Sequence, residues 1–216
     1  MVLYVYKQGI YIMNVIKKIT KKEILFKDNF LSYTKSMIHL PIFALSTDIN
    51  NSDIYTLHID KMDGFKNINF EFPKLSINND FMTFSYILKL FYENCENERD
   101  NPFLIDFNLN DFFDFFGKAR NNRSAATKAI TLCVKRLSRL NMSFVRNDKT
   151  YICNFISSAV IENNNERNFK ISLGEGFLNF FKHDTDLIFN INLDNYKALE
   201  KDFSKILYLY YITNLH

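Results

Sequence analysis

Basic residues that could contact phosphate groups are concentrated between Phe115 and Asn147. They are Lys118, Arg120, Arg123, Lys128, Lys135, Arg136, Arg139 and Arg146, and no aspartate or glutamate interrupts them. The formal charge of the 216-residue chain is only +3, so the residues outside this segment, which carries +8, sum to −5. Lysines and arginines at this density can neutralise nucleic-acid phosphates and release the counterions bound to them. The distribution of charge, more than its total, therefore indicates a phosphate-binding surface.

A predicted helix from Ala125 to Leu140 would display much of this charge on one side. Its apolar residues recur with heptad-like spacing and are expected to be buried: Ala126, Ile130, Cys133, Leu137 and Leu140. The opposite face would carry Lys128, Thr131, Lys135, and Ser138 or Arg139. Arg123, Ser124 and Thr127 fall at the amino end, where Ser124 can cap the helix and backbone N–H groups can meet a phosphate. Arginine contacts to guanine are the commonest specific readout, so we expect Arg123 and Arg139 to read bases.

The elements around this helix must hold it against a groove. A helix is predicted over Asn78–Glu93 and a short strand over Phe103–Phe107. Asn108 can cap a further helix from Leu109 that ends at Gly117, and the turn that follows contains Arg120. Strands Ser143–Arg146 and Thr150–Ile156 flank an Asn147-Asp148 turn, which would place Arg146 and Lys149 on a wing. This order predicts an α+β protein with a winged helix-turn-helix domain.

The expected DNA-binding residues follow from this placement. They are Arg120, Arg123, Ser124, Thr127, Lys128, Thr131, Lys135, Arg139, Arg146 and Lys149. The alternative is an ordinary solvated helix whose lysines and arginines face water. An isolated cationic helix would favour that alternative, but here the order of the neighbouring elements agrees with the charge. The sequence therefore favours double-stranded DNA as the partner.

The rest of the chain divides around this domain. Residues 1–50 are expected to form an N-terminal arm with a basic segment, and translation could begin at Met1 or Met13. The winged-helix domain is expected over residues 51–161, with strands at Ile54–Asp60 and Ile68–Phe72. Residues 162–216 would hold a linker hairpin and the start of a second, truncated winged-helix domain. A strand predicted at Phe155–Ile161 ends the winged-helix domain and forms the hairpin with a predicted strand Asn168–Leu173. The last part also has a predicted strand Leu187–Ile191 and helices near Glu175–Lys182 and from Asn195.

Residues that could support catalysis lack the spacing that catalysis needs. The three cysteines are an odd number without short spacing, typical of reduced thiols, and the four histidines are scattered. Asp106, Asp111 and Asp114 are close in sequence, but acidic residues in a first helical turn simply favour the helix dipole. We expect no enzyme activity, no metal and no cofactor. The chain also lacks a signal peptide and a membrane-length apolar run, so a cytoplasmic protein with no membrane partner is predicted.

The chain resembles the initiator proteins of plasmid replication, particularly the TrfA-like and related Rep winged-helix initiators. The resemblance covers about two thirds of the chain and follows pattern and order rather than a rigid signature. Besides the basic helix, its segments are Pro73–Leu75, Asn79–Leu88, Phe103–Phe107, Phe115–Gly117, Lys170–Leu173, Phe177–Phe181 and Ser204–His216. The last of these is similar to the aromatic helix that opens the second winged-helix domain of such proteins.

The resemblance implies a plasmid replication initiator that binds directly repeated sites at an origin. Such proteins help to open an AT-rich duplex, with the host initiator and helicase as further partners, and homodimer formation is left open. The chain departs from the pattern at His216, where a second recognition helix and wing would be expected. A winged-helix transcriptional repressor of a plasmid or phage would use the same basic helix. A third alternative is an interaction module whose aromatic face binds a protein and whose charge is incidental.

Overall fold

The computed structural model describes residues 30–34, 42–45, 53–62, 65–117, 121–162, 167–176 and 188–214. The strands are β1 (Phe30–Thr34), β2 (Phe43–Ala44), β3 (Tyr55–Met62), β4 (Phe65–Phe72), β5 (Leu75–Ser76), β6 (Leu104–Asn108), β7 (Asn141–Arg146), β8 (Lys149–Asn154), β9 (Ile156–Ile161), β10 (Asn168–Leu173) and β11 (Ile188–Asn192). The helices are α3 (Asp80–Glu96), α4 (Leu109–Phe116), α5 (Arg123–Leu137), α7 (Leu193–Ala198) and α8 (Asp202–Asn214). The predicted mixture of helices with antiparallel strands is confirmed. The basic segment predicted within the N-terminal arm, at residues 14–28 with five lysines, lies outside the described residues.

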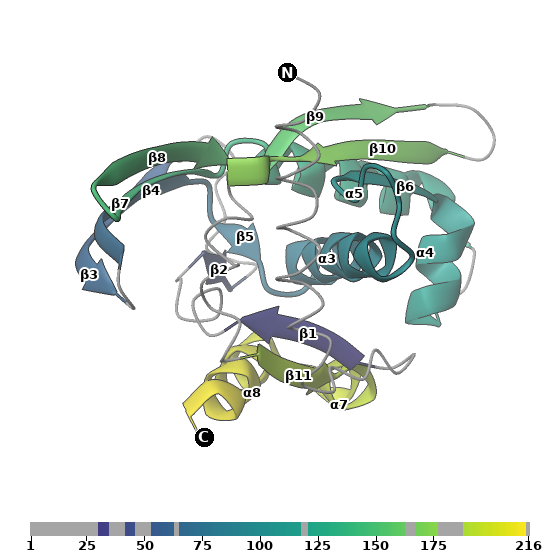
Figure 1. Ribbon diagram of the computed structural model, residues 1–216. Coiled ribbons are helices and arrows are strands. Elements are labelled where there is room, and N and C mark those ends of the chain that lie inside the picture. Colours follow the sequence, from purple (N-terminus) through teal and green to yellow (C-terminus); the bar gives the residue numbers. More distant parts are fainter. Residues whose placement is uncertain are drawn as a thin grey trace.

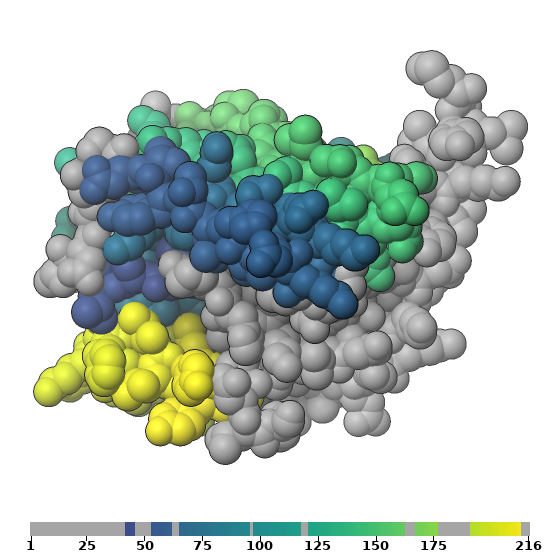
Figure 2. Space-filling view, turned by 90° about the vertical axis from the view of Figure 1, so that its left-hand side faces the viewer, coloured from purple at the N-terminus to yellow at the C-terminus, as the bar shows by residue number. Residues whose placement is uncertain are grey.

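Two antiparallel sheets make up most of the β structure. One has four strands in the order β3-β4-β7-β8, and the other has three in the order β6-β10-β9. A third antiparallel pair joins β1 to β11, while β2 and β5 form a short parallel pair. Figure 2 shows the blue atoms of β3 and β4 beside the green atoms of β7 and β8 on one continuous surface.

Helix α3 lies in the centre of the molecule, between the three-stranded sheet and the β1–β11 pair (Figure 1). Its aromatic residues pack toward elements that are distant in sequence. The ring of Phe84 lies 5.0 Å from that of Phe155, and Phe81 stacks on Tyr196 of α7 at 4.7 Å. The Tyr196 hydroxyl also donates a hydrogen bond to the Ile77 carbonyl at 2.5 Å. Helix α3 therefore joins parts of the fold that lie far apart in the sequence.

Helix α4 begins and ends where the sequence predicts. The Asn108 side chain accepts hydrogen bonds from the backbone N–H groups of Asn110 and Asp111, and the Asp111 side chain completes a capping box. Gly117 ends the helix in the left-handed conformation, with φ of 59°. The predicted apolar stripe is buried: Leu109, Phe112, Phe113 and Phe116.

Helix α5 buries most of the predicted stripe but begins at Arg123, two residues before its predicted start at Ala125. Asn122, with φ of 62°, is the N-cap residue, so Ser124 lies inside the helix and its predicted capping role is wrong. Of the predicted stripe, Ile130, Cys133, Leu137 and Leu140 are buried and Ala126 is half-buried. Val134 is buried as well, because the helix also packs against α3.

The two hairpins that follow α5 belong to different sheets. The β7–β8 hairpin turns at Asn147 and Asp148, whose φ angles of 47° and 59° suit a tight two-residue turn. This hairpin pairs through β7 with β4. The β9–β10 hairpin instead places β10 between β6 and β9. Strand β6, which directly precedes α4, therefore pairs with the second of the two hairpins.

The C-terminal part contains two short helices where one was predicted from Asn195. Helix α7 begins after Asn192, whose side chain accepts a hydrogen bond from the Asn195 N–H, and α8 follows at Asp202. Strand β11 lies within one residue of its prediction and pairs with β1 of the expected N-terminal arm. Most of the predicted helix Glu175–Lys182 lies outside the described residues.

Candidate nucleic-acid interface

The outward face of α5 carries cations that project into solvent. Lys128 and Lys135 are exposed, two turns apart on the helix, and Thr131 between them is half-buried. Arg139 is exposed in the turn after the helix, and Ser124 is exposed in its first turn. No acidic residue occurs in the fifteen residues of α5. The structure thus brings together Ser124, Lys128, Thr131 and Lys135 on one helix, with Arg139 just beyond it.

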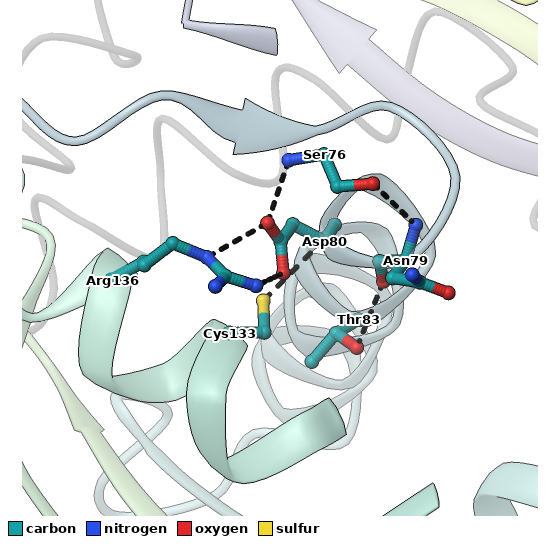
Figure 3. A network of polar contacts seen from close by, with 6 residues as sticks. All are labelled: Ser76, Asn79, Asp80, Thr83, Cys133 and Arg136. Carbon is teal, nitrogen blue, oxygen red and sulfur yellow. Dashed lines mark hydrogen bonds and ion pairs between the residues drawn. The ribbon is translucent and has the colours of Figure 1, made fainter. Parts of the chain in front are cut away.

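Arg136 has a different role from its basic neighbours, because it pairs with a buried carboxylate (Figure 3). Its Nε and Nη2 atoms donate hydrogen bonds to the two Asp80 oxygens at 2.9 and 2.6 Å. Asp80 is completely buried and also accepts a hydrogen bond from the Ser76 backbone N–H at 2.6 Å. One of the eight charges in the basic segment is therefore neutralised inside the fold, where it fastens α5 to α3.

The thiol of Cys133 completes this buried network. It donates a hydrogen bond to the Asp80 carbonyl oxygen over 3.6 Å. Burial, with the Asp80 charge as a second cause, holds the pKa of the Cys133 thiol well above its usual value. Cys133 is therefore a protonated packing residue of α5.

The amino end of α5 is tied to both of its neighbours. Arg123 donates a hydrogen bond from Nη1 to the Asn110 side-chain oxygen of α4 at 2.6 Å. The Thr127 hydroxyl donates to the Arg123 carbonyl at 2.9 Å and accepts from Nη1 of Arg167 at 2.8 Å. Arg123 and Thr127, both expected at the DNA, thus also fix α5 against α4 and against the β9–β10 hairpin.

Arg167 is a residue of this site that sequence reasoning missed. It lies just before β10 and has a positive φ of 56°. Its only local signal is a basic residue at the end of an asparagine-rich tract, which any polar loop could show. Its partner Thr127 is forty residues away along the chain, so no short-range pattern could have paired them.

Arg146 and Lys149 lie away from α5, at the turn of the β7–β8 hairpin. Figure 1 shows this hairpin at the opposite side of the molecule from α4, in the four-stranded sheet. The Arg146 guanidinium lies 4.8 Å above the ring of Phe65, and desolvation lowers its pKa. Its Nη1 atom is buried with no hydrogen-bond partner among the described residues. Lys149 is exposed. Arg120 and Lys118 lie outside the described residues.

Among the described residues, no group of three or more histidine, cysteine or acidic side chains could hold a metal ion. No helix in those ranges is long and apolar enough to cross a membrane.

Comparison with known proteins gives a structural likeness but no family. No protein-family model matches the chain, and no curated protein matches it. Among solved structures, the chain is similar to domains 2 and 3 of RctB, with a TM-score of 0.47 and 12% sequence identity. The match covers 81% of this chain and 70% of that chain.

Proposed function

We propose that this protein binds double-stranded DNA through the outward face of α5. The observation that carries the proposal is the division of α5 into two sides. One side is buried against the core, and the other presents Lys128 and Lys135 to solvent with no acidic residue on the helix. A helix of this kind can enter a major groove, where its cations meet phosphates on either side.

The elements around α5 support a winged-helix arrangement. Helices α4 and α5 follow β6 directly, and the β9–β10 hairpin returns to pair with β6 through β10. In a helix-turn-helix the first helix of the pair braces the second against the DNA backbone. Here the bond between Arg123 and Asn110 supplies one such brace between α5 and α4.

The wing of this arrangement is proposed at the β9–β10 hairpin, rather than at Asn147-Asp148. The reason is the hydrogen bond from Arg167 to Thr127, which holds the start of β10 beside the amino-terminal half of α5. Arg146, at the β7–β8 turn, instead lies over the ring of Phe65 on β4. Arg146 and Lys149 therefore fall outside the proposed interface.

A salt-dependent binding measurement tests the proposal. Fluorescence anisotropy with a labelled duplex would compare the unmodified protein with a Lys128→Ala/Lys135→Ala variant at several salt concentrations. Loss of two phosphate contacts should weaken binding to every duplex and reduce the slope of log K against log salt by about 2.

A matched control removes two lysines elsewhere. Lys61 and Lys66 are exposed and face one another across β3 and β4, so a Lys61→Ala/Lys66→Ala variant loses the same charge. That variant should keep nearly all affinity and an unchanged slope. Equal losses in both variants would refute the placement on α5, and absence of binding to any duplex at low salt would refute DNA binding.

The DNA is proposed to be a plasmid replication origin, with the protein acting as an initiator at repeated sites. This step is supported by the sequence resemblance to plasmid initiators. It is tested by footprinting the protein on the DNA that flanks its gene, with permanganate to detect unpaired thymines. Protection of repeats together with opening of an adjacent AT-rich tract is the expected result. Protection without opening would overturn the initiator step and favour a repressor, while leaving DNA binding intact.

A further inference from the structure

Strand β9 is an edge strand whose side chains are exposed on both faces of its sheet. It has β10 on one side and no strand on the other among the described residues. Its four central residues, Ser157–Val160, are all exposed, and Val160 is 58% exposed. Figure 1 shows β9 along the upper margin of the coloured elements, with β10 beneath it.

The two edges of the four-stranded sheet carry charges of the kind that usually prevent strand addition. His58, Asp60 and Lys61 occur on β3, and Lys149 begins β8. By contrast, β9 has the sequence ISSAVI, with no charge and no proline. An uncharged edge of small and β-branched residues is a template for pairing with another strand.

The hydrogen-bond pattern shows which backbone groups of β9 face away from the sheet. The Glu162 N–H donates to the Asn168 carbonyl at 2.9 Å, which makes residues 162 and 168 a hydrogen-bonded pair. The Leu173 N–H donates to the Phe103 carbonyl on the β6 side, in agreement with that alternation. Because antiparallel ladders alternate, Val160 bonds to β10 through its backbone, while Ala159 and Ile161 direct theirs outward. No hydrogen bond to these outward groups occurs within the described part of the chain.

We propose that β9 pairs with β9 of a second copy of this chain, antiparallel about a two-fold axis at Val160. The outward residues Ala159 and Ile161 lie on either side of Val160. Ala159 of one copy would therefore pair with Ile161 of the other, and Ile161 with Ala159. The two three-stranded sheets would then form one sheet of six strands. The inference goes beyond DNA binding and does not depend on it.

The side chains that this register brings together are compatible. The two Val160 side chains would face each other about 5 Å apart and cover apolar surface that is now exposed. Ser158 would lie opposite Glu162 of the second copy, so no like charges meet. Glu162 already pairs with Lys170 of its own chain at 2.8 Å, which leaves the net charge at this edge low. A second copy is therefore complementary to β9 in both backbone and charge.

Sedimentation velocity without DNA, over protein concentrations up to about 100 µM, tests this pairing. The unmodified protein should show concentration-dependent dimers. Val160→Lys places two ammonium groups opposite each other and should weaken dimerisation about tenfold or more, with partial recovery at high salt. Ala159→Pro should also abolish pairing, because it removes an N–H that faces the second copy and not β10.

The control is Ile152→Lys on the edge strand β8, where the side chain is 84% exposed. It adds the same charge outside the proposed contact and should leave dimerisation unchanged. Far-ultraviolet circular dichroism would establish that Val160→Lys stays folded, as expected for so exposed a position. A protein that is monomeric throughout, or dimers that resist both β9 substitutions, would overturn the inference. Neither result would bear on DNA binding by α5.

Discussion

The ion pair between Asp80 and Arg136 offers a direct test of how α5 is held in place. Replacing Asp80 with alanine removes a carboxylate that is fully buried, while the Arg136 side chain stays 12% exposed. The arginine then keeps its charge without its two short hydrogen bonds at 2.9 and 2.6 Å. The Ser76 backbone N–H, which is also buried, loses its bond to the same carboxylate.

The expected cost is large for a domain of this size. Breaking one side of a buried ion pair costs about 3–5 kcal/mol, because the remaining charge is left uncompensated. A domain is usually stable by only about 5–15 kcal/mol, so Asp80→Ala should lower the denaturation midpoint strongly. Arg136→Met should cost a similar amount, since it leaves Asp80 buried without its partner. The double variant should lose less than the sum of the two, because neither charge is then stranded.

Urea denaturation followed by far-ultraviolet circular dichroism is the suitable assay, because the chain contains no tryptophan. The four free energies of unfolding form a double-mutant cycle. A coupling energy of about 2 kcal/mol or more is expected for a contact of this geometry. A loss below about 1 kcal/mol for Asp80→Ala, or strictly additive losses, would refute the view that this pair fastens α5 to α3.

Two further predictions concern local features. Both ring nitrogens of His58 face side-chain oxygens, of Asn69 at 2.7 Å and Asp60 at 2.9 Å, and these hydrogen bonds raise its pKa above 6.5. The stabilisation that protonated His58 contributes is therefore fully present below its pKa in the unfolded chain. It is lost as pH rises through the higher pKa of His58 in the folded protein. Nuclear magnetic resonance titration should show Asn69→Ala moving the His58 pKa back toward 6.5, and an unchanged value would contradict the assignment. Gly117→Ala should destabilise the protein by about 1–2 kcal/mol from its left-handed φ alone, since no atom lies within 4 Å of the added Cβ. A thermal melt would check this, and a stabilised variant would contradict it.

The parts of the fold that short-range patterns specify were predictable. The Asn108 cap and the Gly117 end of α4 depend on residues within a few positions of each other, as does the buried stripe of α5. Strand β10 occupies the predicted residues Asn168–Leu173, because alternation of polar and apolar residues is a local signal.

Long-range pairing was the part that the sequence could not supply. Two consecutive hairpins have similar local signals, and nothing in either states that β7 joins β4 while β10 joins β6. The same limit applies to side chains. Arg136 looks like any other basic residue of the segment until its partner Asp80, 56 positions earlier, is known. The outward lysines of α5 could be predicted because helical periodicity alone separates them from the core.

The central position of α3 has a consequence for synthesis of the chain. This helix leaves the ribosome well before the residues that enclose it, which include Arg136, Phe155 and finally Tyr196. Phe43, which also contacts both rings, precedes them in the chain, but Phe81 and Phe84 must stay without their later neighbours until most of the chain has been translated. Contacts that span more than a hundred residues slow folding, because a long loop must close before they form. Until then the nascent chain exposes aromatic side chains of α3 that are buried once folding is complete, and such exposed apolar surface favours aggregation.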